Sequence, residues 1–284
     1  MLLNLITALS ALLAVIQAIF GIFWLLPVYF VGYFAGFFLL AAVVLLVVAA
    51  LVDPNKPQDG EDPVYRWLAQ NYIDLVVRLA RVRIETQGLE KAPKDGRFLL
   101  VCNHINDVDP AVLLHCFPKA QLAFIAKRET KDFFVIGPML LKLQCQLVNR
   151  ENDREALKTI LKCIQIIKED KASIGVFPEG YVSLDGKLRH FRSGVLKIAQ
   201  KTGVPIVVCT LQGTKTVLPN LKKLKPSQVK MHLVDVIRAE RVQSMSTVEL
   251  GEQIYEMMIA DLGEQYRCDE KAMHPDLQRK AMEQ

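Results

Sequence analysis

The chain has 284 residues, of which 51% are hydrophobic, and its formal net charge is +5. This length allows one catalytic domain of ordinary size plus a membrane anchor. Residues 1–52 contain no Asp, Glu, Lys or Arg, and every charged residue lies from Asp53 onward. The division excludes a chain that is polar throughout and indicates an apolar anchor followed by a polar body.

The anchor holds two candidate membrane segments, from about Leu2 to Leu26 and from about Tyr33 to Val52. A span needs roughly 20 apolar residues, and each segment meets that length. Pro27 and Gly32 predict the turn between the two segments. A cleaved signal peptide is not favoured, because it would carry a basic region before one short apolar core.

All Lys and Arg residues follow the second segment, beginning with Lys56. The positive-inside rule therefore predicts that the body lies on the cytoplasmic face of the membrane. The pattern leaves open whether the two segments cross the bilayer or form a shallow hairpin in one leaflet. The side on which the body lies is the same in both cases.

A polar linker, residues 53–62, precedes a helix that is predicted from Pro63 to about Ala80. The apolar residues that recur there at helical spacing are Val64, Leu68, Tyr72, Leu75 and Leu79. Arginines border this helix, so it is suited to lie on anionic lipid as an interfacial helix. The alternative, an ordinary surface helix packed on the body, stays open.

Short apolar runs then alternate with helical patterns. Strands are predicted at Phe98–Cys102, Leu122–Ala126, Leu147–Val148, Ser173–Phe177, Pro205–Leu211 and Val229–Ile237. Helices are predicted at Asp109–Phe117, Gly137–Leu143, Arg154–Glu169, Ser193–Lys201 and Thr247–Leu262. This alternation predicts an α/β fold with a mixed, largely parallel sheet flanked by helices. The predicted parts are a two-helix membrane hairpin (1–52), the linker and interfacial helix (53–83), a catalytic domain (84–263) and a polar tail (264–284).

A histidine and an aspartate follow the first predicted strand of the body. Asp109 and Pro110 predict a helix start, so His104 falls in the loop between strand and helix. Such a loop can bring His104 and Asp109 into hydrogen-bonding contact, an arrangement in which the histidine can act as a general base. A His and an Asp at this spacing also arise by chance, and His115 in the next helix is interpreted as a packed or surface histidine.

A second candidate is the turn Phe177-Pro178-Glu179-Gly180, again at the end of a predicted strand. Loops of this kind form the ligand crevice of open α/β sheets, although a plain turn is the alternative. The planar guanidinium of arginine is suited to bind phosphate. The cationic candidates for a phosphate contact are Lys127, Arg128, Arg150 and Arg192. The six cysteines have no metal-ligand spacing and are interpreted as small hydrophobic residues, reduced in a cytoplasmic body.

Taken in order, these blocks resemble the glycerolipid acyltransferase family that includes 1-acylglycerol-3-phosphate acyltransferases. NHINDVD at 103–109 is similar to the family's NHxxxxD block, and VFPEG at 176–180 is similar to its third block. The stretch at 126–150 resembles the second block, and TGVPIVVCTLQGT at 202–214 resembles the fourth. HFRSG at 190–194 resembles a basic segment between the last two. The resemblance covers about residues 85–215.

The resemblance implies an acyltransferase that moves a fatty acyl group from acyl-CoA or an acyl-carrier protein to the sn-2 hydroxyl of 1-acylglycerol 3-phosphate, giving phosphatidic acid. It implies that His104 takes the hydroxyl proton and that Asp109 orients His104. It also implies that Arg150 contacts the acceptor's phosphate and that Glu179 and Gly180 help to shape the acceptor site. The further candidates for substrate binding are Asn103, Lys127, Arg128 and Arg192. Membrane lipid is the expected partner; nucleic acid, a metal, another cofactor and an acyl-enzyme intermediate are not expected.

The chain departs from the family pattern at three places. Tyr181 and Val182 stand where Thr and Arg are usual after the third block, Gln144 replaces a usual Gly, and Val208 replaces a usual Pro. The missing Arg would normally add positive charge near the phosphate. Alternative expectations are therefore another lysophospholipid or glycerol 3-phosphate as acceptor, or a membrane-tethered lipid-binding protein without catalysis.

Overall fold

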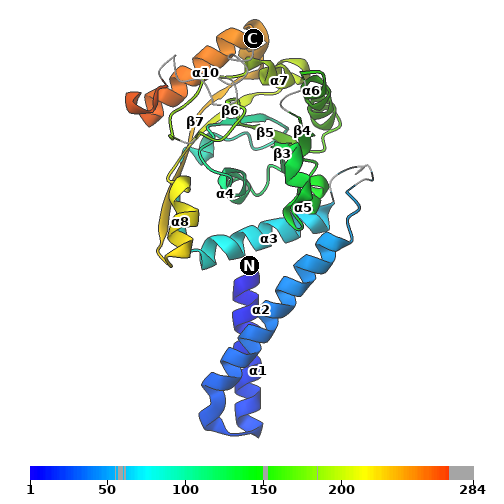
Figure 1. Cartoon of the computed structure of the whole chain (residues 1–284), viewed down its shortest axis with the longest axis vertical. Coiled ribbons are helices and arrows are strands. Elements are labelled where there is room, and N and C mark those ends of the chain that lie inside the picture. Colours follow the sequence, from blue (N-terminus) through cyan, green and yellow to red (C-terminus); the bar gives the residue numbers. More distant parts are fainter. Residues whose placement is uncertain (55, 57–59, 61, 150–152, 184, 269–284) are drawn as a thin grey trace, which may run out of the picture.

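The computed structural model describes residues 1–268 except 55, 57–59, 61, 150–152 and 184. Two helices, α1 (Leu2–Phe20) and α2 (Leu26–Ala50), pack side by side as an N-terminal hairpin that projects from the body (Figure 1). Both helices are long and apolar enough to cross a membrane, judged by length and composition.

The turn of the hairpin lies earlier than the sequence predicted. It runs from Gly21 through the short 3-10 helix η1 (Phe23–Leu25), whereas Pro27 and Gly32 both lie inside α2. Proline is well accommodated in the first turn of a helix, because the N–H that it lacks has no partner there. Pro27 therefore starts the second helix rather than breaking the chain, and the prediction of the turn at 27–32 was wrong.

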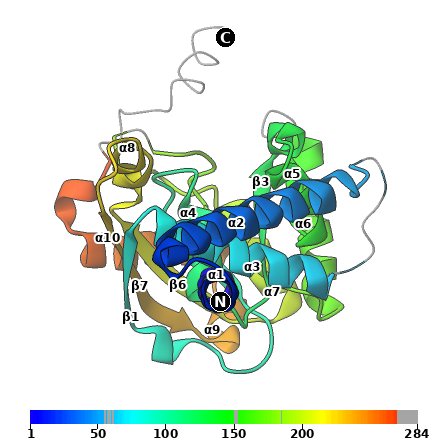
Figure 2. The ribbon, with the colours of Figure 1, turned by 90° about the horizontal axis from the view of Figure 1, so that it is seen from below.

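Helix α3 (Pro63–Leu79) lies between the hairpin and the body (Figures 1 and 2). Asp62 caps its start by accepting hydrogen bonds from two backbone N–H groups. Arg66 is buried and donates a hydrogen bond of 2.8 Å to the carbonyl of Leu122 in the body. On the opposite side, the Tyr72 hydroxyl donates to the carbonyl of Ala41 in α2. The helix therefore joins the hairpin to the body.

The body contains a seven-stranded sheet in the order β1-β7-β6-β2-β5-β3-β4. The strands are β1 (Val82–Gln87), β2 (Leu99–Cys102), β3 (Leu122–Lys127), β4 (Gln146–Val148), β5 (Ser173–Val176), β6 (Ile206–Gln212) and β7 (Ser227–Ile237). All neighbouring pairs are parallel except β6 and β7, which are antiparallel. The predicted mixed, largely parallel sheet is confirmed. Strand β1 was not predicted, because it is an edge strand with mostly exposed side chains and carries no buried apolar run.

Helices cover the sheet and connect its strands. They are α4 (Asp109–Cys116), α5 (Ile136–Lys142), α6 (Asp153–Lys168), α7 (Lys197–Thr202), α8 (Val217–Lys222), α9 (Ala239–Ser244) and α10 (Thr247–Leu262). Helix α10 has the predicted bounds, and Ser246 and Glu249 form a capping box at its start. The short helices α8 and α9 were not predicted, since each has too few turns for a periodic pattern.

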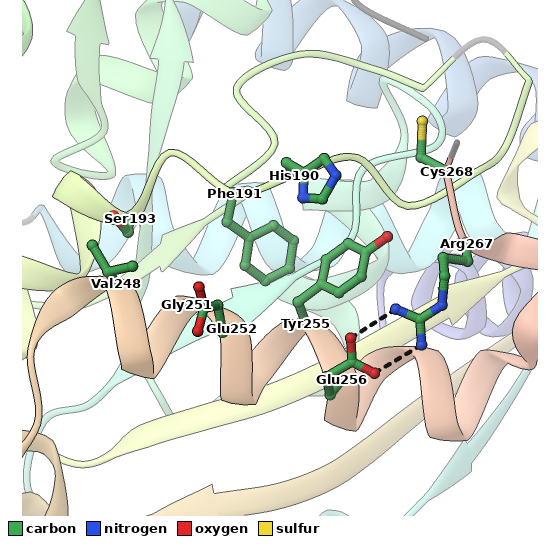
Figure 3. Close-up of a pocket in the computed structure, with 10 residues that line it drawn as sticks. All are labelled: His190, Phe191, Ser193, Val248, Gly251, Glu252, Tyr255, Glu256, Arg267 and Cys268. Carbon is green, nitrogen blue, oxygen red and sulfur yellow. Dashed lines mark hydrogen bonds and ion pairs between the residues drawn. The ribbon is translucent and has the colours of Figure 1, made fainter. Parts of the chain in front are cut away.

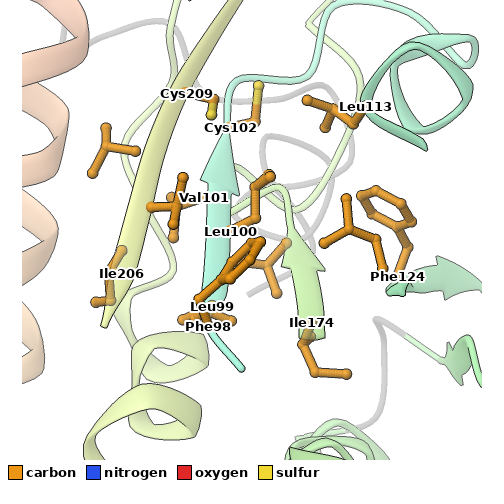
Figure 4. Close-up of a cluster of buried hydrophobic side chains, with 14 of the residues drawn as sticks. Phe98, Leu99, Leu100, Val101, Cys102, Leu113, Phe124, Ile174, Ile206 and Cys209 are labelled. Atoms are coloured by element: carbon orange, nitrogen blue, oxygen red, sulfur yellow. The ribbon is translucent and has the colours of Figure 1, made fainter. Parts of the chain in front are cut away.

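Strand β2 lies at the centre of the core (Figure 4). Leu99, Leu100, Val101 and Cys102 are fully buried between β5 and β6. Phe124 on β3 packs directly over Gly175, where any added Cβ would come within 2.3 Å of its ring. Because β2 and β5 are parallel neighbours, the loops after their carboxyl ends meet at one edge of the sheet.

Candidate active site

The loop that follows β2 (residues 103–108, the site loop) holds the predicted His–Asp pair. His104 Nδ1 lies 2.9 Å from Asp109 Oδ2, and the same oxygen accepts the backbone N–H groups of Ile105 at 2.7 Å and Asn106 at 2.8 Å. Asp109 is fully buried. The carboxylate therefore fixes the imidazole orientation and leaves Nε2 as the nitrogen available to a substrate.

Asp109 differs from the expected helix cap. It is the first residue of α4, which has no side-chain cap, and its carboxylate turns back to the site loop. The three hydrogen bonds from that loop, two of them from backbone N–H groups, satisfy the oxygen better than a single helical N–H would. The same carboxylate thus shapes the loop and orients His104.

Asn103 anchors the start of the site loop to β6. Its side-chain amide donates to the Leu211 carbonyl at 2.9 Å, and its side-chain oxygen accepts the Leu211 N–H at 2.7 Å. The side chain is buried. Asn103, implied by the family resemblance to bind substrate, is placed here as a residue that positions the loop.

Glu179 holds the same loop from the other side. Its Oε1 accepts the backbone N–H of His104 at 2.7 Å, and its Oε2 accepts that of Arg189 at 2.9 Å. The side chain is 1% exposed. Burial raises the pKa of Glu179 to about 8, while the two backbone N–H groups act in the opposite direction. Glu179 acts on the site through the backbone of His104 and does not contact the cavity.

The ring of His104 stacks on Phe177, with centroids 4.1 Å apart and planes 19° apart. Phe177 in turn stacks on Phe124 at 5.8 Å. Stacking on the half-buried Phe177 limits the motion of the imidazole, so Nε2 keeps one direction. Sequence reasoning missed this role of Phe177, although an aromatic residue directly before the Pro-Glu-Gly turn was the available signal.

A cavity of about 1070 Å³ opens beside His104 and is called the main cavity. Its walls are predominantly apolar and come from α2, α3, α4, α5 and α8 together with the ends of β3 and β5. Its polar members include His104, Lys127 and Arg192. A large apolar cavity that is also lined by a histidine and two cations can hold an amphiphile with an anionic head.

The predicted cationic residues divide into three groups. Lys127 and Arg192 line the main cavity, and Lys127 forms an ion pair of 3.6 Å with Glu129, which also lines it. Arg128 forms an ion pair of 2.6 Å with Glu155 and is not among the residues that line the main cavity. Arg150 lies outside the described residues.

Gly180 brings Arg192 close to the Pro-Glu-Gly turn. Gly180 has φ +81°, a left-handed conformation, and an added Cβ would meet Arg192 Nε at 3.1 Å. The backbone N–H of Arg192 donates to the carbonyl of Pro178 at 2.9 Å. Val182, which stands where the family usually has Arg, also lines the main cavity. Arg192 therefore supplies positive charge beside the position where that charge is missing.

A second cavity of about 410 Å³ lies between α10 and residues 190–193 (Figure 3). His190 stacks on Tyr255, and Arg267 forms an ion pair with Glu256. His104 and Asp109 are not among its lining residues. A substrate that reacts at the His104–Asp109 pair would therefore bind in the main cavity.

Comparisons with known proteins agree with this geometry. Residues 83–212 match a family model described as Acyltransferase. The chain is 29% identical over 198 residues to a probable 1-acyl-sn-glycerol-3-phosphate acyltransferase of Mycoplasma pneumoniae, covering 67% of this chain and 73% of that protein. It is 29% identical over 196 residues to a 1-acyl-sn-glycerol-3-phosphate acyltransferase of Borreliella burgdorferi, covering 63% of this chain and 78% of that protein.

The fold is similar to that in a crystal structure of the 1-acyl-sn-glycerophosphate (LPA) acyltransferase PlsC from Thermotoga maritima. The TM-score is 0.57 and the sequence identity 21%, and the match covers 94% of this chain and 100% of that one. The family model spans the strands and loops that carry both the His–Asp pair and the Pro-Glu-Gly turn. Residues 83–212 therefore form an acyltransferase domain, and the comparisons identify the enzyme class as an O-acyltransferase.

Proposed function

We propose that the enzyme transfers a fatty acyl group from a thioester donor to the sn-2 hydroxyl of 1-acylglycerol 3-phosphate, forming phosphatidic acid. The observation that carries this proposal is the placement of the His104–Asp109 pair at the wall of a large apolar cavity that also contains two cations. The relatives named above as 1-acyl-sn-glycerol-3-phosphate acyltransferases support the same acceptor.

In the proposed reaction, His104 Nε2 accepts the proton of the acceptor hydroxyl as its oxygen attacks the thioester carbonyl carbon. Asp109 stabilises the imidazolium that forms, because its buried carboxylate faces Nδ1. The carbon–sulfur bond then breaks, and the leaving thiolate takes the proton from His104. The enzyme returns to its starting state without an acyl-enzyme intermediate, and the mechanism calls on no metal or other cofactor.

The acceptor phosphate is assigned to Lys127 and Arg192, because both line the main cavity that contains His104. An arginine fork binds two phosphate oxygens at once, and a lysine adds a point charge. The acyl chains occupy the apolar part of the same cavity. Acyl-CoA and acyl-carrier protein are both thioester donors that this chemistry accepts.

The hairpin and α3 support a membrane location for the enzyme. Helix α3 exposes Val64 (62%), Trp67 (50%) and Val76 (58%) while Leu68 and Leu75 are buried. An enzyme on the membrane avoids extracting its lipid, which would cost about 0.8 kcal/mol for each CH₂ exposed to water. Since the basic residues all follow the hairpin, we place the body on the cytoplasmic face.

The test is a product analysis of the full chain in detergent with labelled acyl-CoA or acyl-carrier protein. Each donor is paired with 1-acylglycerol 3-phosphate, with glycerol 3-phosphate and with a monoacylglycerol that lacks the phosphate. The proposal expects labelled phosphatidic acid as the main product. Release of free fatty acid that does not depend on an acceptor would show a hydrolase instead, and lipid binding without transfer would show a catalytically inactive relative.

A matched pair of arginine variants tests the phosphate contact. Arg192→Ala should raise the KM for 1-acylglycerol 3-phosphate by about 10-fold, because a hydrogen bond to a charged group contributes roughly 1.5–3 kcal/mol. The control is Arg128→Ala, which removes the same charge outside the main cavity and should leave that KM unchanged. Equal effects of the two variants would reject Arg192 as a phosphate ligand.

A further inference from the structure

Helix α8 and the turn that follows it expose three leucines on one short segment. Leu218 is 45% exposed, Leu221 is 41% exposed and Leu224 is 79% exposed. The helix is nevertheless fixed to the body, because Val217 at its start is buried and β7 follows the turn directly. Leu224 is therefore presented to the surroundings by a folded element, while Leu218 and Leu221 border the main cavity.

Leu224 has a strained backbone as well as an exposed side chain. Its φ of +54° lies in the left-handed region, which L-residues other than Asn, Asp and Gly rarely occupy. Asn220 holds the turn in place: its carbonyl accepts the Lys225 N–H at 2.9 Å, and its side-chain amide donates to the Pro226 carbonyl at 3.1 Å. The left-handed residue ends helix α8, and these hydrogen bonds hold Leu224 in an exposed position there.

The same turn is strongly basic. Lys222, Lys223 and Lys225 are exposed and surround Leu224 in the sequence KKLK. We call residues 221–226 the Leu224 turn. Exposed leucine between lysines is the composition of segments that lie on anionic lipid, where the side-chain hydrocarbon enters the headgroup region and the ammonium groups meet phosphates.

The position of α8 points to the membrane that the hairpin is built for. Figure 1 shows α8 at the end of the body that faces the hairpin, and Figure 2 shows α8 and α5 on either side of α4 in the view from that end. Leu218 and Leu221 of α8 line the main cavity together with Leu45 of α2. On the far side of this cavity, the segment before α5 exposes Phe133 (59%).

We propose that the Leu224 turn docks on the anionic surface of the bilayer as a second membrane contact, separate from the hairpin, and places the mouth of the main cavity against the headgroups. The inference rests on the proposed membrane location of the enzyme. It adds a charge-selective contact on one rim of the cavity, which the apolar hairpin cannot provide. A lipid acceptor then reaches His104 from the leaflet without passing through water.

The test is hydrogen–deuterium exchange of the full chain in detergent and in two kinds of lipid nanodisc. One disc contains phosphatidylcholine alone, and the other also contains phosphatidylglycerol. Amides of residues 220–227 are expected to exchange about 10-fold more slowly in the anionic disc, because each lysine near an anionic surface contributes binding free energy. The hairpin is expected to be protected equally in both discs.

A charge-reversal variant with a matched control identifies the residues responsible. Lys222→Glu, Lys223→Glu and Lys225→Glu combined should abolish the added protection in anionic discs. The control combines Lys158→Glu, Lys162→Glu and Lys168→Glu on α6, which makes the same change in charge on another exposed helix face. The control should keep the protection of residues 220–227.

Leu224→Gly separates the contact from the fold. Glycine adopts φ +54° without strain, so the variant should unfold at a higher temperature in detergent while losing protection in anionic discs. A variant that loses stability and protection together would show that Leu224 serves packing, and it would overturn the proposal.

Three further exchange results would also decide against lipid docking of the Leu224 turn. Equal exchange of residues 220–227 in detergent and both discs would overturn the proposal, and so would protection that survives the triple Glu variant. Protection that appears in detergent and grows with protein concentration would show a second copy of the chain on α8 instead of lipid. None of these readouts uses product formation, so failure of the proposed acyl transfer would be recognised separately.

Discussion

Within the part of the chain that the structure describes, two His–Asp pairs have similar geometry. His104 Nδ1 lies 2.9 Å from Asp109 Oδ2, and His232 Nδ1 lies 2.5 Å from Asp261 Oδ1. In the second pair, Asp261 also accepts a hydrogen bond from the Thr210 hydroxyl. The first pair lies within one loop and the start of its helix, whereas the second joins β7 to α10.

The surroundings of the two pairs differ more than their distances do. His104 lines the main cavity, stacks on Phe177 and belongs to a loop that Asn103 and Glu179 hold from both sides. His232 is not among the residues that line either of the two cavities described above. A His–Asp pair becomes a catalytic candidate only where the second ring nitrogen meets a space for substrate. Four variants test this difference.

Asp109→Asn should have the largest effect among them. Asp109 Oδ2 accepts hydrogen bonds from two backbone N–H groups as well as facing His104 Nδ1, and an amide cannot satisfy them and also stabilise an imidazolium. We expect kcat to fall by about 10²–10⁴-fold. The measurement is the rate of acyl transfer at saturating acceptor. Asp261→Asn is the matched control, and a comparable loss in that variant would remove the distinction between the two pairs.

Above about pH 8, where Glu179 is ionised, Glu179→Gln should lower kcat by about 10-fold or more, because glutamine can accept only one of the two backbone hydrogen bonds that hold His104 and Arg189. The substitution should also change how the free energy of unfolding depends on pH. The pKa of Glu179 is about 8 in the folded state and near 4.5 when exposed. Between these values the folded state binds the proton more tightly, so the free energy of unfolding falls as pH rises.

The stability measurement compares chemical unfolding of the native chain and Glu179→Gln at about pH 5 and about pH 8. The native chain should lose stability over this interval, and the variant should lose less. Parallel pH dependences in the two proteins would contradict a raised pKa at Glu179.

Gly180→Ala should act on substrate binding with a smaller effect. The new Cβ would approach Arg192 Nε and add backbone strain of about 1 kcal/mol, so KM for the phosphate-bearing acceptor should rise by about 5-fold. Gly186→Ala is the control, since Gly186 has φ +83° with open space around its Cβ position. If both variants raise KM equally, strain alone is the cause and the contact with Arg192 is irrelevant.

His232→Ala should have the smallest effect on activity. It removes the link between β7 and α10, so we expect a loss of about 1–2 kcal/mol in the free energy of unfolding. The rate of acyl transfer should stay within about twofold of the native rate, since substitutions away from the reacting atoms act mainly on stability. A large fall in rate without a fall in stability would place His232 in catalysis.

The catalytic candidates could be predicted from the sequence because they are local. His104 and Asp109 are separated by five positions in the chain. The apolar strand before them and the Asp-Pro helix start can each be recognised from neighbouring residues alone. The roles of Asn103 and Glu179 could not be predicted, because each depends on a partner far along the chain. Asn103 bonds to Leu211, 108 positions away, and Glu179 bonds to His104, 75 positions away.

The helices and strands show the same contrast between local and long-range determinants. Buried strands such as β2 and β5 are continuous apolar runs and were predicted nearly to the residue. Strand β1 was missed because it is stabilised by pairing with β7 rather than by its own apolar side chains. Helix α8 was missed because it is short, and the hairpin turn was misplaced because Pro27 is compatible with a helix start.

The most direct test measures the rate of labelled phosphatidic acid formation in His104→Ala and His232→Ala side by side, with folding of both variants checked by thermal unfolding in detergent. We predict a loss of about 10²–10⁴-fold in His104→Ala and a rate within about twofold of native in His232→Ala. A native rate in His104→Ala, or an equal loss in the two folded variants, would contradict the assignment of His104 as the base.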